Sequence, residues 1–435
     1  MGNSSYTFVL MAFLSATLCT AQEILKVEEA VRIALENNYQ IKTATNELQI
    51  DAISISRGNA GMLPQIGASI SDNNSTQYLS QTRSDGTKVE RDNAKNNNLN
   101  YGVALDWTLF DGLRMFANYE QLKETKKLGE AELKQVILTK VGEVMITYYD
   151  LVQQHQQLSA LDSTLIISQQ RVELAQNRFT IGKASKLEVL NAQVDLNTDQ
   201  TVMQRQKELY ANTKIQLNEQ LARDLQTDYK VVPEIFVDHG LLLPELETRV
   251  ANENPQIQAE MVNKRISELE LKQIRASRYP SIFATTGYNF GRTESSLGFT
   301  TSSNSRGWNY GFGATLNIFD GLNQNRNEKI GKIALENAEV AIAEQKQELM
   351  SLVGTTYQTY LTNISLIELE EKNETIAKEN LDITVEKYRI GIIPTIEFRT
   401  AQLNYINARV RYSNAKFQAK LSEIILKQLA GNLIL

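Results

Sequence analysis

The 435-residue chain has very few of the residues from which disulfides and metal centres are built. It contains one cysteine, Cys19, and two histidines, His155 and His239, which lie far apart. A single cysteine leaves no partner for an intramolecular disulfide, and two distant histidines argue against a histidine-based metal site. Phosphate-binding loops, dinucleotide-binding glycine motifs and HExxH zinc motifs are also absent. We therefore expect no enzyme, no cofactor and no bound metal.

The chain also lacks an excess of basic residues and any long apolar run. It has 45 basic and 51 acidic side chains, a net charge of −6, and no basic stripe, so nucleic acid is not an expected partner. No apolar run approaches the ~20 residues that a transmembrane helix needs. With 42% hydrophobic and 22% charged residues, the composition is nevertheless typical of a folded protein.

The first 21 residues are predicted to be an export signal. They contain no charged side chain, residues 8–14 form a short apolar core, and small residues precede a possible cleavage after Ala21. The mature chain would then lack cysteine, which suits an oxidising compartment. A lipid anchor on Cys19 is the alternative, although Leu18 is larger than the residue that usually precedes a lipidated cysteine.

The chain contains an internal repeat, which is the most informative feature of the sequence. Residues 110–113 (Phe-Asp-Gly-Leu) return as residues 319–322, an offset of 209. Earlier in the chain the offset is 216, as between Asn38 and Asn254. The first half therefore carries seven additional residues before the Phe-Asp-Gly-Leu sequence. We place them in the polar segment 71–98, which we predict to be an exposed loop.

Two proline-free segments, residues 113–177 and 322–389, predict very long helices. Apolar residues recur in them at steps of three and four. Each segment would form a helix of about 65 residues, roughly 100 Å long at 1.5 Å per residue. Helices of this length cannot be buried in one globular core, so we expect them to pack side by side as coiled coils.

Both long helices have predicted caps at equivalent positions. Asp111 and Asp320 are predicted N-caps, because each directly follows an apolar strand. Gly182 and Gly391 stand where a left-handed residue commonly ends a helix. The two copies of each signal support the same hairpin in both halves.

A second helix is predicted to follow each of these glycines at once. Ser185 and Glu188 form a capping box, and Pro394 suits the first turn of the matching helix in the second half. Each half is thus predicted to contain a long helical hairpin with a tight tip.

The residues before Asp111 and Asp320 alternate between apolar and small polar side chains, which predicts strands of roughly 10 residues. Weaker alternation predicts preceding strands at about 65–71 and 281–290. The apolar residues are Leu99, Tyr101, Val103, Leu105, Trp107 and Leu109, and then Trp308, Tyr310, Phe312, Ala314, Leu316 and Ile318. This pattern is typical of strands that face outer-membrane lipid, although a soluble sheet with one buried face also explains it.

Four strands are too few to close a barrel, since single-chain membrane barrels begin at about 8. An open sheet in lipid would leave its edge hydrogen bonds unsatisfied. If the strands lie in a membrane, the protein must therefore be an oligomer whose copies share one barrel. The long helices would then form a tube that extends away from the membrane.

These features together resemble the TolC-like outer-membrane efflux ducts of Gram-negative bacteria, over nearly the whole mature chain. Residues 27–38 are similar to the opening helix of that family, residues 110–112 and 319–321 to its strand-to-helix junctions, and residues 178–193 to its first periplasmic tip. The junction residues are Asp111, Gly112, Asp320 and Gly321.

The resemblance implies a mainly α fold with a membrane β part. Long antiparallel helical hairpins would form an α-barrel, and each protomer of a homotrimer would supply four strands of a shared twelve-stranded β-barrel. We divide the chain into a signal peptide (1–21), a first repeat (22–224), an equatorial linker (225–255) and a second repeat (256–435). The implied function is passive export in a tripartite efflux or type I secretion system, coupled through a periplasmic adaptor to an inner-membrane pump.

The resemblance also assigns roles to residues at the tips. In the family, acidic side chains six and nine residues after the second tip glycine ring the periplasmic entrance. Those positions are Glu397 and Thr400 here, and Glu188 and Asn191 in the first half. Only one position of each pair is acidic, and helix capping alone explains either glutamate. The expected adaptor-docking residues are Phe179, Gly182, Ser185, Tyr388, Gly391 and Pro394.

An exported coiled-coil scaffold with a soluble sheet is the alternative to a duct. It explains the long helices but not the alternation and aromatic content of the strands. The transported substrate stays open, because a lumen lined by Asn, Ser, Thr and Gln selects little. Drugs, metal ions and secreted polypeptides are all compatible with such a lumen.

Overall fold

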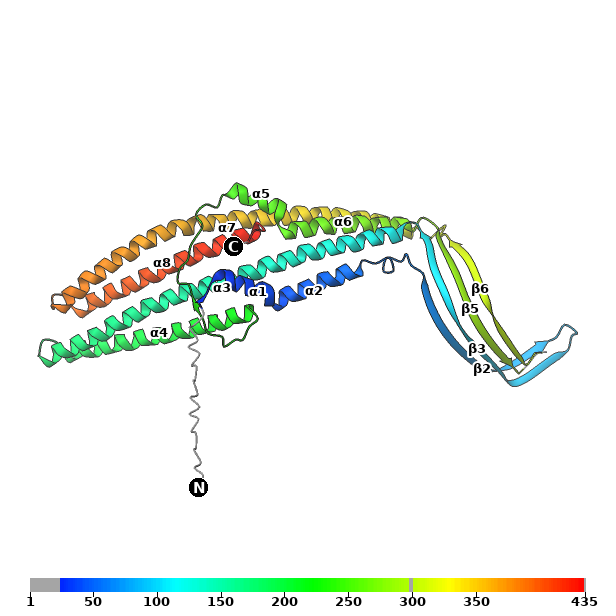
Figure 1. Ribbon diagram of the computed structural model, residues 1–435, viewed down its shortest axis with the longest axis horizontal. Coiled ribbons are helices and arrows are strands. Elements are labelled where there is room, and N and C mark those ends of the chain that lie inside the picture. Colours follow the sequence, from blue (N-terminus) through cyan, green and yellow to red (C-terminus); the bar gives the residue numbers. More distant parts are fainter. Residues whose placement is uncertain (1–23, 297–299, 434–435) are drawn as a thin grey trace, which may run out of the picture.

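The computed structural model describes residues 24–296 and 300–433, so the predicted signal segment and Cys19 lie outside the described residues. The molecule is elongated, with helices along most of its length and a sheet at one end (Figure 1). Among the described residues, no helix combines the length and apolar character needed to cross a membrane. The elements in order are β1 (Ile24–Leu25), α1 (Val27–Asn37), α2 (Tyr39–Ser54), β2 (Gln65–Thr82), β3 (Lys88–Asp111), α3 (Arg114–Thr180), α4 (Lys186–Gln220), β4 (Lys230–Val231), α5 (Leu243–Glu253), α6 (Pro255–Ala276), β5 (Ser281–Ser295), β6 (Ser302–Thr315), α7 (Asn323–Arg389) and α8 (Thr395–Leu429).

The long helices confirm the prediction from the proline-free segments. Both α3 and α7 have 67 residues, and each is followed by a 35-residue helix, α4 or α8. The two hairpins lie side by side, with α3 packed against α8, so that α7 and α4 lie at opposite edges of the helical layer (Figure 1). At 1.5 Å per residue each long helix spans roughly 100 Å.

The four long strands form one antiparallel sheet in the order β2-β3-β5-β6. The central pair joins the two repeats, with Tyr101 opposite Phe290 and their rings stacked 4.8 Å apart. Within the described residues, β2 and β6 each pair on one side only. The sheet of one chain is therefore open at both edges.

The prediction of an exposed loop at residues 71–98 is wrong. This segment continues β2 and β3, and residues as far out as Thr82 and Lys88 are paired. The turn contains Asp85, whose carboxylate accepts a hydrogen bond from the Thr87 backbone at 2.9 Å, and Gly86 at φ +86°. Neither face of this part is apolar, so alternation could not mark it as strand. The Asp-Gly pair was the hairpin signal that the sequence did contain.

The strands also differ in length from the expected 10 residues. They have 18, 24, 15 and 14 residues in chain order. The last strand, β6, ends earlier than the apolar pattern predicted. It stops at Thr315, before Leu316 and Ile318. Thr315 is paired with Ser281, the residue after Pro280, and a proline has no amide hydrogen with which to extend the ladder.

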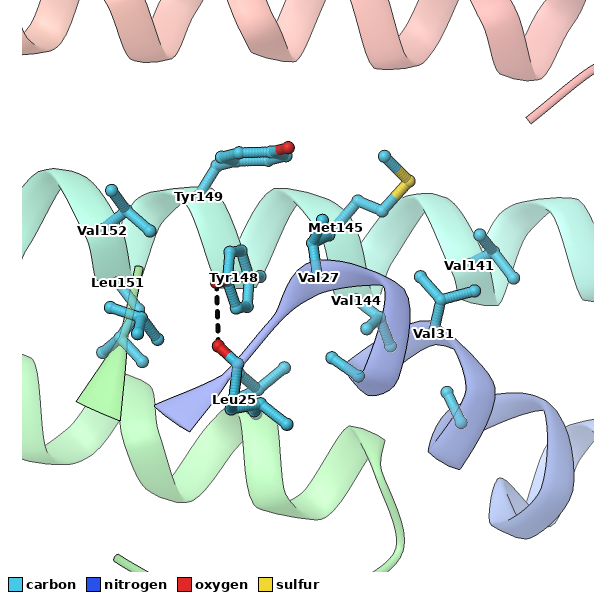
Figure 2. Packing of buried hydrophobic residues seen from close by; sticks show 14 of the residues in the cluster. Leu25, Val27, Val31, Val141, Val144, Met145, Tyr148, Tyr149, Leu151 and Val152 are labelled. Carbon is cyan, nitrogen blue, oxygen red and sulfur yellow. Dashed lines mark hydrogen bonds between the residues drawn. The ribbon is translucent and has the colours of Figure 1, made fainter. Parts of the chain in front are cut away.

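The main core lies at the middle of α3, where the first residues of the described chain pack across it (Figure 2). Leu25 in β1 and Val144 and Leu151 in α3 are almost fully buried. The Tyr148 hydroxyl donates to the Leu25 carbonyl at 2.9 Å and accepts from the Val232 amide at 3.3 Å. This tyrosine therefore holds both short strands, β1 and β4, against the long helix.

The repeated asparagines Asn38 and Asn254 perform the same task in both halves. Each caps a helix, accepting from the amide of Gln40 at 2.9 Å or of Gln256 at 2.8 Å. Each side-chain amide also donates to a carbonyl at the far end of a hairpin, that of Gln220 or Leu429, at 2.9 Å. The duplication thus repeats a specific contact and not only a sequence pattern.

Two tyrosines of the core should make the protein less stable at alkaline pH. Burial raises the pKa of Tyr149 and of Tyr229 from 10.0 to about 12. Since the folded pKa exceeds the unfolded one, the stability is fully present below about pH 10 and is lost as pH rises through about 12. We expect a loss of about 2–3 kcal/mol for each hydroxyl, measured by calorimetry. Tyr149→Phe should remove about half of the loss, and an unchanged melting temperature up to about pH 11.5 would contradict the prediction.

Candidate functional site at the hairpin tips

The two tips have the left-handed glycines that the sequence predicted. Gly182 has φ +74° and Gly391 has φ +81°. After each helix the chain makes the hydrogen bond typical of a glycine cap, from Lys183 to the Arg178 carbonyl at 2.8 Å and from Ile392 to the Lys387 carbonyl at 3.0 Å. A Cβ added at either glycine would meet nothing within 4 Å. The tips are therefore tight, exposed turns.

The capping box predicted after the first tip forms only in part. Ser185 is the N-cap of α4, and its hydroxyl accepts from the Glu188 amide at 3.3 Å. The Glu188 carboxylate instead accepts from the Tyr388 hydroxyl at 3.2 Å and lies 3.5 Å from the Arg178 guanidinium. Pro394 is the N-cap residue of α8, one position before the first turn where we expected it. Glu188 thus connects the first tip to the second hairpin, a contact that its capping role did not predict.

Tyr388 is buried at this contact, with 2% of its surface exposed. Its ring packs against Phe398 with the centroids 4.9 Å apart, and burial raises the pKa of its hydroxyl. Phe179, its counterpart in the first half, is 38% exposed, and the Lys186 ammonium lies 5.6 Å from its ring centre. The two positions therefore differ: Tyr388 contacts the other hairpin, whereas Phe179 lies on the surface.

The other predicted entrance residues are exposed on the helices that follow the tips. Glu397 and Thr400 lie in the first turns of α8, and Asn191 lies in α4. The Thr400 hydroxyl donates to the Ile396 carbonyl at 2.9 Å. Of the two acidic positions, Glu188 is thus engaged by neighbouring side chains of its own chain, whereas Glu397 faces solvent.

A buried charge cluster further from the tips was not predicted. Asp199 in α4 forms a two-pronged ion pair with Arg399 in α8, with both nitrogen–oxygen distances 2.8 Å. The Ser168 hydroxyl also donates to Asp199, at 2.6 Å. A second pair, Arg171 with Asp195, lies beside it, and the Arg399 Nε is 3.8 Å from the Asp195 carboxylate. The spacing of four residues between the two aspartates, which puts them on one face of α4, was the available signal.

Hydrogen bonding is sufficient to keep Arg399 charged in this environment. Burial by itself would lower its pKa, but the hydrogen bonds and charge of Asp199, together with the charge of Asp195, raise the pKa above its ordinary value. The side chains of Arg399 and Asp199 are only 11% and 8% exposed. The cluster therefore joins the two hairpins through α4 and α8.

At the end of α3 and α7 away from the tips, the prediction that Asp111 and Asp320 are the N-cap residues is wrong, although both carboxylates accept from an amide of the first helical turn. Asp111 accepts from the Met115 amide at 3.0 Å and Asp320 from the Gln324 amide at 2.7 Å. The N-cap residues themselves are the following leucines, both in the left-handed region. Gly112 has no room for a side chain, since a Cβ would lie 2.2 Å from the Ala276 carbonyl oxygen. Gly321, at φ +69°, has more space around it.

The sequence model of the family described as Outer membrane efflux protein matches residues 30–223 and 248–432. The chain belongs to this family. The match in two segments agrees with the internal duplication, and it confirms the resemblance inferred from the repeated motifs. The protein is an outer-membrane efflux channel of the tripartite type, with a helical part that extends into the periplasm, and not an enzyme.

Individual relatives are distant in sequence but similar along almost the whole chain. The probable outer membrane lipoprotein SilC of Salmonella typhimurium is 21% identical over 418 residues, covering 93% of this chain and 86% of that protein. The Campylobacter jejuni CmeC outer membrane channel has a TM-score of 0.77 at 19% identity, covering 94% of this chain and 86% of that one. The Neisseria gonorrhoeae MtrE channel, in its open state, has a TM-score of 0.72 at 17% identity, with coverages of 94% and 89%. Channels of this fold form trimers.

Proposed function

We propose that this protein is the homotrimeric exit duct through which an inner-membrane pump exports its substrate, joined to that pump by a periplasmic adaptor at the hairpin tips. Transport through the duct itself is passive. The observation that carries the proposal is that each side of the described protomer has two edges without a partner. One edge is formed by a helix and the other by a strand of the sheet. Family membership favours this function over an exported scaffold.

The helical edges carry exposed apolar side chains at heptad spacing. On α7 these are Leu369, Ile376 and Ile383, each at least half exposed. On α4 they include Leu187 and Val194, which are 65% and 63% exposed. Stripes of this kind form the seam of a coiled coil. In a closed ring of three copies, α7 of one protomer would pack against α4 of the next.

The sheet edges require the same arrangement. In the part of one chain that the structure describes, strands β2 and β6 each have a free edge, and such edges are unfavourable in lipid. Pairing β6 of one protomer with β2 of the next would close a ring of twelve strands without a remaining edge. The two kinds of edge lie on corresponding sides of the protomer, which supports one three-fold arrangement for both.

Glu397 should make the entrance of this duct selective for cations. Three-fold symmetry would place three copies of its carboxylate around one axis, and a narrow mouth would bring them within a Debye length of about 8 Å. Rings of carboxylates favour cations in channels. We expect Glu397→Gln to lower the selectivity for potassium over chloride, measured from reversal potentials in planar bilayers.

Glu188→Gln is the matched control for this prediction. The Glu188 carboxylate is already engaged by Tyr388 and Arg178, so its charge should contribute less to the passing ions. If the Glu397 variant has the same selectivity as the wild type, Glu397 only favours the start of its helix and the entrance lies elsewhere.

Two measurements on cells test the proposed assembly. The protein should be found in the outer-membrane fraction as trimers that heating in detergent dissociates. After crosslinking in living cells, the trimer should co-purify with an adaptor and a pump. A monomer in the soluble periplasmic fraction, with no crosslinked partners, would exclude the proposal.

A further inference from the structure

A cavity of about 400 Å³ lies along the middle of α8, with walls from α3, α7 and α8. Its size is that of pockets that hold small organic molecules, which measure about 300–1,000 Å³. Four of its lining residues are charged, namely Glu374 and Lys378 on α7 and Arg409 and Lys416 on α8. Three cations thus share the cavity with one carboxylate.

These charged groups are accessible and are not neutralised by ion pairs. In the part of the chain that the structure describes, no carboxylate pairs with Lys378, Arg409 or Lys416. Arg409 donates from its Nη1 to the Tyr405 hydroxyl at 3.2 Å, which leaves Nε and Nη2 on one edge of the guanidinium without a partner. None of the four charged residues is buried, and all of them line the cavity, so a molecule in it can reach them.

One end of the cavity, around Tyr405, has two cations. The antiparallel helices α7 and α8 are in register at Tyr412, whose hydroxyl donates to the Glu371 carboxylate at 2.9 Å. Lys378 follows Glu371 by seven residues, and Tyr405 precedes Tyr412 by the same number. Lys378 therefore lies opposite Tyr405, roughly 10 Å along α8 from Tyr412. Arg409, which donates to Tyr405, is at this end too.

The other end of the cavity, around Tyr412, has one cation and one carboxylate. The Lys416 ammonium lies 4.2 Å from the centre of the Tyr412 ring. Glu374 follows Glu371 by three residues and so lies on the same face of α7. Burial raises the pKa of Tyr412 to about 12, with further contributions from its hydrogen bond to Glu371 and from the charges of Glu371 and Glu374. The two ends of the cavity therefore differ in charge.

We propose that this cavity binds an α-amino dicarboxylate, that is, an acidic amino acid or a small derivative of one. The α-carboxylate of the ligand binds Lys416, and its α-ammonium group binds Glu374. The distal carboxylate binds Lys378 and accepts from the Nε and Nη2 of Arg409, which match its two oxygens. A ligand without the ammonium group would leave Glu374 unpaired, and one without the distal carboxylate would leave two cations unpaired. All these groups belong to one protomer, so binding does not depend on the proposed trimer or on an adaptor.

Three molecules with the same carbon chain test this assignment. L-α-Aminoadipate has all three charged groups, adipate lacks the ammonium group, and L-norleucine lacks the distal carboxylate. The purified full-length protein in a neutral detergent is titrated with each, and binding is followed by ligand-observed NMR. We expect saturable binding of α-aminoadipate, and binding weaker by about fivefold or more for adipate and norleucine, because each loses a contact between partly exposed charges. Equal affinity for all three would overturn the proposal, as would no saturable binding of α-aminoadipate up to about 10 mM.

Two variants test the two ends of the cavity separately. Glu374→Gln should lower the preference for α-aminoadipate over adipate, and Arg409→Gln the preference for α-aminoadipate over norleucine, each by about threefold or more. Each preference is a ratio of affinities within one variant, so a general loss of stability does not change it. Arg389→Gln is the control, because the Arg389 side chain is 63% exposed and does not line the cavity, and it should leave both preferences unchanged. If both preferences persist in the Glu374 and Arg409 variants, the probe binds elsewhere and the proposal is wrong.

Discussion

Arg399→Met is expected to weaken the contact between the two helical hairpins by about 3–5 kcal/mol. The substitution leaves Asp199 buried without its two-pronged partner, and a buried unpaired charge is costly because it has lost its water. The remaining Ser168 hydroxyl supplies only one of the hydrogen bonds that this carboxylate needs. Thermal unfolding of the purified protein should show the loss, and the channel conductance in planar bilayers should rise as the hairpins separate near the tips.

The double variant Arg399→Met with Asp199→Leu distinguishes the loss of the ion pair from the cost of leaving the Asp199 charge buried and unpaired. Replacing both charges by apolar side chains of similar size removes the unpaired charge, so most of the stability and the wild-type conductance should return. Arg411→Met is the surface control, since the Arg411 side chain is 52% exposed in its pair with Glu370, and it should change stability by less than about 1 kcal/mol. If Arg399→Met behaves like Arg411→Met, the buried cluster does not hold the hairpins together.

Gly391→Trp should abolish export while the protein still assembles in the outer membrane. The open space around Gly391 means that an indole would not clash within the chain, although its φ of +81° adds a backbone strain of about 1–2 kcal/mol. The bulky side chain would project from the tip and prevent the close approach of an adaptor hairpin. Export is measured as the sensitivity of cells to a pump substrate, and assembly as the amount of heat-dissociable oligomer in the outer-membrane fraction.

Gly391→Ala is the matched control, because it introduces the same backbone strain without the bulk. It should retain export, with a slightly lower melting temperature. Normal export by the tryptophan variant would show that the adaptor docks away from this tip. Loss of export in the alanine variant would mean instead that the left-handed backbone, and not free space at the tip, is what export requires.

Much of the architecture could be predicted because it depends on local and periodic signals. Proline-free heptad segments predicted both 67-residue helices to within a few residues of their ends. The tip glycines were predictable because few residues other than glycine adopt a left-handed conformation without strain. The duplication and the family followed from two ordered copies of these signals. The outer part of the sheet did not, because β2 and β3 have no alternating apolar face beyond Ser71, and the pairing of their backbones leaves no periodic signal in the sequence.

Contacts between hairpins were decided by the tertiary structure alone. Glu188 and Tyr388 are 200 positions apart, as are Asp199 and Arg399, and nothing in the local sequence marks them as partners. The same holds for Arg171, which would be an ordinary surface arginine on an isolated α3. Side-by-side packing of α3 on α8 removes these charged groups from water. Each of them is then stable only if the neighbouring helix supplies a hydrogen-bonding or oppositely charged side chain. The sequence therefore determined which helices exist and where they end, whereas the packing of one hairpin on the other determined which of their polar residues bind each other.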